Sequence, residues 1–164
     1  MYIYLKHRTT KQLVKAQVIK AEKKDMPDNW KFNWKQLYNR DSMYYKVVTE
    51  TSPEVIEGLL MVTILNGEML FLNNIEVAPH NYGKTGIYDF VAGCIFAFSC
   101  NLSLIYGKGY YKGYVVFDSK TKLIEHYQNK YGAVLLSSQR MCIYKEIGIK
   151  LIKQYLGIEE VDYE

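Results

Sequence analysis

Asn66-Gly67 separates two apolar runs and restricts the fold of this chain more than any other feature. The runs cover residues 55–65 and 69–77. Asn and Gly readily adopt the left-handed backbone angles of a two-residue hairpin turn, so this pair between apolar runs is the strongest short-range hairpin signal. Residues 55–77 are therefore expected to form an antiparallel hairpin.

The second run of the hairpin leads through Pro79 into a polar loop with two glycines. Residues 75–86 read IEVAPHNYGKTG, and an apolar segment with helical spacing follows at 87–100. Strand, glycine-bearing loop and helix is the order of a backbone anion site. The N–H groups at a helix N-terminus lack intrahelical partners, and the helix dipole favours negative charge there. The loop thus predicts a phosphate-bearing cofactor.

Other strands are expected where β-branched and aromatic residues cluster between turn signals. They cover residues 43–49, 114–117, 133–136 and 140–144. Residues 11–22 allow a short helix or a strand, because their apolar residues suit both periods.

Helices are expected at residues 87–100, 120–130 and 146–156, with a short one reaching residue 38. Asn33 or Asp28 is the candidate cap of the short helix, and Asp118 or Ser119 that of the helix from 120. A helix between strands 69–77 and 114–117 predicts a parallel crossover. The fold class is therefore α/β (α+β), and residues 1–164 are expected to form a single domain.

Charge, cysteine content and hydropathy argue against a nucleic-acid-binding, disulfide-bonded or membrane-spanning protein. The net charge of +4 suits a small polyanionic cofactor but is too mild to argue for nucleic acid. The three cysteines, Cys94, Cys100 and Cys142, form no CxxC motif and lie in apolar segments. They read as buried free thiols of a cytoplasmic protein. Polar residues interrupt the most apolar window, so no membrane span is expected, and no metal-ligand cluster is visible.

In element order and in three motifs the chain resembles the GNAT acetyltransferases. The motifs are VAPHNYGKTG after the hairpin, YVVF followed by DS, and LIEHYQNKYGA. The EVAP-x-N form at 76–81 resembles a subset of bacterial members. The resemblance covers roughly residues 40–145. It implies a mixed central sheet of about six to seven strands flanked by helices, antiparallel in its N-terminal half, with a parallel crossover after the family's fourth strand.

The resemblance also implies acetyl-CoA as co-substrate, with its pyrophosphate in the loop after the hairpin. The family's loop usually reads V-x-P-x-x-R-G-x-G-x-G. When the chain is aligned with this pattern from Val77, Tyr82 stands at the position of the family's basic residue, and Gly83 is the one glycine that matches. An alignment shifted by one residue would use Gly86 instead. Lys84 could add a charge-assisted contact. The candidate cofactor-binding residues are Val77, Tyr82, Gly83, Lys84, Thr85 and Gly86.

In acetyl transfer to an amine, a base or a water chain removes the amine proton, and an acid can protonate the leaving thiolate. Glu76 is the candidate base, on the same strand face as Leu72 and Asn74 by the two-residue period. The alternative is a solvent-facing or hydrogen-bonded strand glutamate. Tyr127 is the candidate acid, and the alternative is a core tyrosine. Backbone N–H groups of residues 75–77 are the expected donors to the thioester carbonyl if this strand is splayed.

Two functions follow from the resemblance. The first is an acyl-CoA-dependent N-acetyltransferase that moves an acetyl group to an amine by direct attack; no motif specifies the acceptor. The second is a non-catalytic GNAT-like binding or assembly module with weak or no CoA binding. Such a module should expose an apolar patch, for which the terminal helix at 146–156 is a candidate, and a homodimer is possible.

Overall fold

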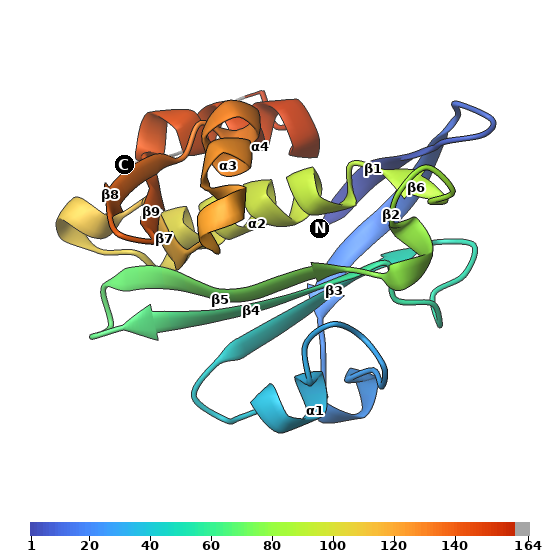
Figure 1. Cartoon of the computed structure of the whole chain (residues 1–164), viewed down its shortest axis with the longest axis horizontal. Helices are drawn as coiled ribbons and strands as arrows, with labels where there is room; N and C mark the ends of the chain where they lie inside the picture. Colours follow the sequence, from blue (N-terminus) through green and yellow to red (C-terminus); the bar gives the residue numbers. More distant parts are fainter. Residues whose placement is uncertain (160–164) are drawn as a thin grey trace.

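The computed structural model describes residues 1–159, which form one mixed sheet with helices on both faces (Figure 1). The strands are β1 (Tyr2–His7), β2 (Leu13–Lys20), β3 (Met43–Thr49), β4 (Gly58–Leu65), β5 (Met69–Val77), β6 (Tyr88–Asp89), β7 (Val115–Asp118), β8 (Val134–Ser137) and β9 (Arg140–Ile143). The α-helices are α1 (Trp34–Leu37), α2 (Val91–Tyr106), α3 (Ile124–Tyr131) and α4 (Lys145–Leu156). Single 3₁₀ turns cover Lys23–Asp25, Pro79–Asn81, Gly109–Tyr111 and Thr121–Leu123.

The predicted hairpin and crossover are confirmed. β4 and β5 pair antiparallel, and Asn66 and Gly67 turn between them with φ of 53° and 69°. The sheet order is β6-β1-β2-β3-β4-β5-β7-β9-β8, and β5 with β7 is its one parallel pair among the described residues. With nine strands in that part of the chain, the sheet exceeds the expected six or seven, because β1 and the two-residue β6 extend one edge.

Two helical boundaries differ from expectation. α2 begins at Val91 rather than at residue 87 and continues to Tyr106. Of the four preceding residues, Tyr88 and Asp89 are a short strand paired with β1, and Phe90 turns the chain into the helix with φ of 78°. The helix expected from residue 120 starts with a 3₁₀ turn and becomes α-helical at Ile124.

One of the expected helix caps is confirmed, and the caps expected for α3 are not. Asn33 caps α1, since its side chain accepts from the N–H of Gln36. Neither Asp118 nor Ser119 caps α3: Asp118 binds Arg140, and the Ser119 hydroxyl donates to the carbonyl of Lys120. The ambiguous segment at 11–22 is a strand, because β1 and β3 pair with it on both sides.

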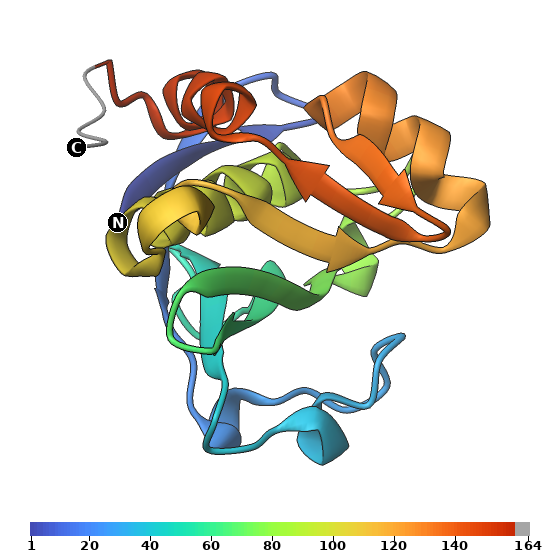
Figure 2. The ribbon, with the colours of Figure 1, turned by 90° about the vertical axis from the view of Figure 1, so that its left-hand side faces the viewer.

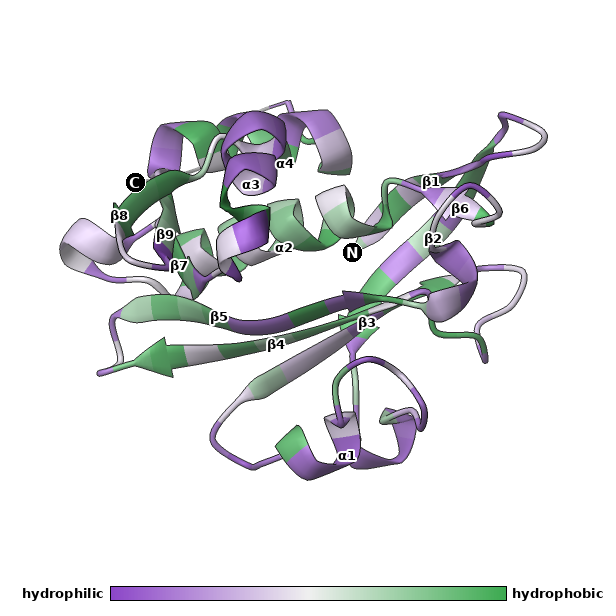
Figure 3. Ribbon diagram, viewed as in Figure 1, coloured by the Kyte–Doolittle hydropathy of each residue, from purple (hydrophilic) through white to green (hydrophobic). Residues whose placement is uncertain are grey.

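The sheet separates two apolar clusters. α2 lies against one face under α4, while α1 lies on the other face (Figures 1 and 2). The smaller cluster joins the sheet to residues 22–42, called the α1 lobe below, around the fully buried Trp34. Figure 3 shows a hydrophilic stretch within the otherwise apolar β5, and this stretch adjoins the candidate site.

Candidate functional site

β5 and β7 separate partway along their length. Their parallel pairing stops at Leu72 opposite Phe117, whereas β5 continues to Val77. At this point β5 carries a bulge: Val62 of β4 faces Leu72, the adjacent Met61 faces Asn74, and Asn73 is the extra residue. A bulge bends its strand and increases the local twist. The edge of β5 beyond Leu72 is therefore unpaired on the β7 side.

The opening between β5 and β7 belongs to a cleft of about 570 Å³. Its wall comprises the second half of β5, the N-terminus of α2, the segment after β7 and one face of α3. A cleft of this size is in the range of small-molecule and cofactor sites.

Backbone N–H groups of β5 face this cleft. The N–H of Ala78 donates to the carbonyl of Glu57 on the β4 side, at 2.9 Å. Successive peptide groups of a strand point to opposite edges. The N–H groups of Ile75 and Val77 are therefore directed toward the β7 side. Of the three N–H groups expected as donors at residues 75–77, those of Ile75 and Val77 are therefore directed toward the cleft.

The bulge places Glu76 on the face opposite the one expected. Leu72 packs in the cluster below α2, but Glu76 lies opposite Leu59 and reaches Trp34, both of the smaller cluster. The expected grouping of Glu76 with Leu72 is thus wrong, because the extra residue Asn73 reverses the alternation after it. Glu76 remains on the face of Asn74.

The carboxylate of Glu76 is buried and accepts four hydrogen bonds. Its Oε1 accepts from the N–H of Phe32 at 2.9 Å and from Nε1–H of Trp34 at 3.0 Å. Its Oε2 accepts from the N–H of Lys31 at 2.8 Å and from the hydroxyl of Tyr82 at 3.1 Å. Three of the four donors belong to the α1 lobe, so Glu76 ties this lobe to β5. These surroundings are those of a hydrogen-bonded strand glutamate, the alternative to the catalytic base that the sequence left open.

Tyr82 connects Glu76 to the cleft. Its ring is 44% exposed and lines the cleft wall, while its hydroxyl donates to Glu76. Burial, followed by the neighbouring Glu76 charge, raises the pKa of Tyr82 to about 12. The phenol therefore stays protonated and keeps its donor at neutral pH.

Tyr127 also lies on the cleft wall. Its ring packs against Phe96 and Phe117, and its hydroxyl makes no hydrogen bond within residues 1–159. Burial raises the pKa of Tyr127. The candidate acid is thus protonated at neutral pH and has a free donor. Tyr131, which was not singled out from the sequence, lines the same wall one turn further along α3.

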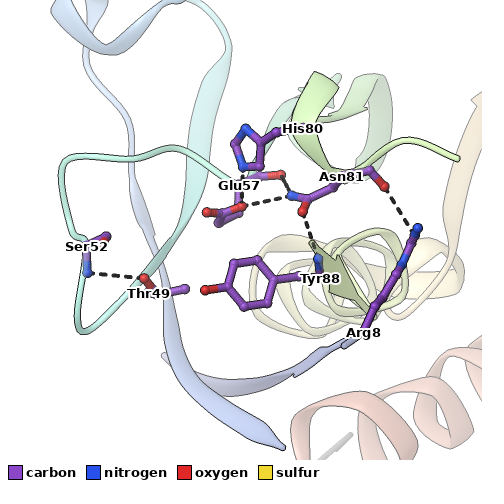
Figure 4. Close-up of polar contacts among 7 residues, drawn as sticks. All are labelled: Arg8, Thr49, Ser52, Glu57, His80, Asn81 and Tyr88. Atoms are coloured by element: carbon purple, nitrogen blue, oxygen red, sulfur yellow. Dashed lines mark hydrogen bonds and ion pairs between the residues drawn. The ribbon is translucent and has the colours of Figure 1, made fainter. Parts of the chain in front are cut away.

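Side chains hold the loop from residue 78 to 90, called the β5–α2 loop below (Figure 4). Glu57 binds His80 at 2.6 Å and accepts from the Asn81 amide at 2.8 Å, and Asn81 accepts from the N–H of Tyr88. Arg8 donates to the carbonyls of Asn81 and Gly83. The loop is therefore shaped by distant side chains rather than by a run of glycines.

The six candidate cofactor residues divide into two groups. Val77, Tyr82 and Gly83 line the cleft, whereas Lys84, Thr85 and Gly86 are not part of its wall. Gly86 instead packs against Asn81 and Arg8, where a Cβ atom would overlap them.

The helix N-terminus that faces the cleft lies further along the chain. The first α2 N–H bonded within the turn is that of Cys94, which donates to Phe90. Val91, Ala92 and Gly93 line the cleft, and their N–H groups precede this first bonded one and have no partner within the helix. Sequence reasoning missed them because it began the helix four residues early.

No helix within residues 1–159 is long and apolar enough to cross a membrane. In the same part of the chain, His, Cys, Asp and Glu side chains form no group of three or more that could hold a metal ion. All three cysteines are buried and unpaired, as expected.

Comparison with known proteins identifies the fold. No protein-family model and no curated protein matches the chain. Among solved structures, AtaTR bound with AcCoA aligns with a TM-score of 0.58 at 10% identity, over 83% of this chain and 97% of that one. A chimera of the Vibrio cholerae spermidine N-acetyltransferase SpeG gives a TM-score of 0.56 at 11% identity, over 82% and 98%.

A third similar structure is Ard1 from Thermoplasma volcanium, with a TM-score of 0.52 at 12% identity over 78% of this chain and 96% of that one. At these identities the likeness concerns the fold. The order of elements and the parallel crossover from β5 to β7 agree with the sheet expected from the GNAT resemblance. The chain has a GNAT-like fold.

Proposed function

We propose that this protein is an acetyl-CoA-dependent N-acetyltransferase that transfers the acetyl group by direct attack of an amine. The observation that carries the proposal is the separation of β5 from β7, which leaves a cleft beside an unpaired strand edge and a helix N-terminus. An extended amide chain such as the pantetheine arm can bind a free strand edge through backbone hydrogen bonds.

The cofactor is proposed to occupy the cleft between β5 and α3. Its thioester carbonyl accepts from a β5 N–H, that of Ile75 or Val77. Its pyrophosphate lies at the N-terminus of α2, where free N–H groups and the helix dipole favour anions. Tyr82 and Gly83 contact the cofactor from the cleft wall, and the adjoining stretch from Lys84 to Gly86 adds the positive charge of its lysine.

Glu76 and Tyr127 are proposed to carry the proton transfers. The amine nitrogen forms a bond to the thioester carbon as the C–S bond breaks, the nitrogen loses a proton, and the sulfur gains one. Because the Glu76 oxygens are buried behind Tyr82, the amine proton reaches Glu76 through the Tyr82 hydroxyl. Tyr127 donates its free hydroxyl proton to the thiolate.

Acetyl-CoA binding is the first test. A ligand at one hundred times its Kd stabilises a protein by about 2.7 kcal/mol, which is a rise of roughly 5–10 °C in Tm for a chain of this size. Thermal melts with acetyl-CoA should show this rise. An unchanged Tm at millimolar acetyl-CoA would contradict the proposal.

Catalysis is tested by thiol release in the presence of amines, since the three buried cysteines give little background. Tyr127→Phe should lower kcat by about tenfold or more while the acetyl-CoA-dependent Tm rise is retained. Tyr110→Phe is the matched control, because Tyr110 is 96% exposed and lies outside the cleft. Equal rates for both variants would remove Tyr127 as the acid.

The non-catalytic module remains the second candidate, because hydrogen bonds already occupy the one glutamate on the cleft wall. The apolar patch expected from the terminal helix is not available, however. α4 buries Leu151, Ile152 and Leu156, and its Gly148 meets Cys100 of α2. Acetyl-CoA binding without thiol release toward any amine would favour this second candidate.

A further inference from the structure

The charges on the cleft wall point to a class of acceptor. We infer that the acceptor amine belongs to a molecule that also carries an anionic group, a carboxylate or a phosphate, and that it is not a polyamine. This inference rests on the proposed acetyltransferase function and specifies the substrate of the same cleft.

Every carboxylate on the cleft wall is already neutralised or hydrogen-bonded. Glu76 accepts four hydrogen bonds. Asp89 binds the guanidinium of Arg8 at 2.6 Å, and Asp118 binds that of Arg140 at 2.5 Å. A polyamine carries several ammonium groups, each of which needs a carboxylate partner when it leaves water. The described wall offers none that is unengaged.

The lysines on the wall are in the opposite situation. Lys31, Lys120 and Lys130 line the cleft, and none of them makes an ion pair within residues 1–159. Lys130 lies over the ring of Tyr131, with 5.7 Å between Nζ and the ring centroid. Among the described residues that line the cleft, the charges without an ion-pair or hydrogen-bond partner are therefore positive, and a bound anion would complement them.

These lysines lie on two sides of the cleft. Lys130 lies in the last turn of α3 and Lys120 precedes this helix, on the side proposed for the cofactor, so the phosphates of acetyl-CoA account for them. Lys31 lies in the α1 lobe, which covers the face of the sheet opposite α2, and its backbone N–H donates to Glu76. A cofactor phosphate bound at the N-terminus of α2 would not contact Lys31, so the Lys31 ammonium is available to a second anion.

The groups around Lys31 define the acceptor end of the cleft. Phe32 and Tyr82 line the same cleft, and the Tyr82 hydroxyl donates to the same Glu76 oxygen, Oε2, as the N–H of Lys31. An acceptor whose amine lies at the Tyr82 hydroxyl can extend its anionic group to the ammonium of Lys31. This arrangement orients the molecule by two opposite charges, which is how a site selects a bifunctional ligand.

Matched acceptors test the inference through kcat/KM from thiol release. An amino acid is compared with its carboxamide, a phosphate ester of an amino alcohol with the free amino alcohol, and both anionic compounds with spermidine. The anionic member of at least one pair should exceed its neutral partner and spermidine by about tenfold or more. Preference for the carboxylate alone or the phosphate alone identifies the source of the anion and supports the inference either way.

Charge reversal at Lys31 supplies the second arm. Lys31→Glu should lower kcat/KM for the anionic acceptors by about tenfold or more and raise it for spermidine. Lys35→Glu is the control, because Lys35 lies in the same lobe but pairs with Asp28 and does not line the cleft. Equal profiles for the two variants would overturn the role of Lys31.

The outcomes separate this inference from the proposed function. If acetyl-CoA raises Tm and spermidine or neutral amines are preferred, the enzyme stands and the anionic acceptor is wrong. Acetyl-CoA binding with no acetylation of any compound in the panel also overturns the inference. If acetyl-CoA does not bind, the proposed function fails first and the inference fails with it.

Discussion

Replacing Glu76 by glutamine tests how the α1 lobe is attached to the sheet. The glutamine carbonyl can still accept from the N–H of Phe32 and from the indole of Trp34. Its amide group, however, would face the N–H of Lys31, which is a donor opposite a donor. The substitution therefore leaves one backbone donor unsatisfied and removes the negative charge from the remaining bonds.

The expected loss of folding free energy follows from these contacts. A buried unsatisfied donor costs about 1–3 kcal/mol, and hydrogen bonds to a charged acceptor exceed neutral ones by roughly 1 kcal/mol. We therefore expect Glu76→Gln to destabilise the protein by about 2–4 kcal/mol. For a chain of this length this corresponds to a fall in Tm of roughly 4–16 °C.

Two spectroscopic probes make the prediction specific to the lobe. Both tryptophans of the chain, Trp30 and Trp34, lie in the α1 lobe, and Trp34 is fully buried. Tryptophan emission therefore reports the lobe, while far-ultraviolet circular dichroism reports the whole fold. In the variant, the emission should shift to the red at a lower temperature than the dichroism transition.

Glu57→Gln is the matched control. The Glu57 carboxylate is also buried, but it binds His80 and Asn81 instead of the lobe. It should lower Tm without separating the two transitions. If Glu76→Gln unfolds at the wild-type temperature with coincident transitions, the tethering role of Glu76 is refuted.

Three other predictions concern the α2 helix and the buried thiols. Phe90→Asn should stabilise the protein by about 0.5–1 kcal/mol in urea unfolding, because asparagine tolerates the left-handed backbone better. A loss of stability would mean that the edge-to-face contact between the rings of Phe90 and Tyr155 outweighs the backbone effect. Gly93→Ala should cost about 1–3 kcal/mol, since the new Cβ would overlap the ring of Tyr155, and a smaller cost in a Tyr155→Ala background would confirm that contact. Burial raises the pKa of Cys100 to about 12 from 9.0, so above pH 9 the unfolded thiol ionises while the folded one does not. Stability should then fall by up to about 1.4 kcal/mol per pH unit for this thiol, and Cys100→Ala should reduce the slope.

Local sequence signals were sufficient for much of the fold. The Asn66-Gly67 turn and its flanking apolar runs predicted the hairpin, since both residues take the backbone angles that the turn needs. Asn33, one of the two candidate caps, likewise marks the start of α1. These features depend on neighbours within a few residues, which is the range over which propensity and capping act.

The errors arose where distant residues decide the local structure. Residue 87 has helical spacing to the apolar residues of α2, yet the chain there is extended because β1 pairs with Tyr88 and Asp89. Arg8 determines the shape of the β5–α2 loop from more than seventy residues away. No pattern within residues 75–100 contains this information, so the helix start and the N–H groups at the cleft were misplaced.

The bulge at Asn73 connects the fold to the candidate chemistry. An unbulged β5 would keep Glu76 on the face of Leu72, beneath α2, and its edge would have no bend at which to leave β7. One extra residue changes both properties together: it leaves the N–H groups of Ile75 and Val77 directed toward the cleft, and it turns Glu76 toward the α1 lobe. The polar Asn73-Asn74 pair in an apolar strand is the sequence signal of this site, because unpaired, cleft-facing positions are the ones in a buried strand that accept polar side chains.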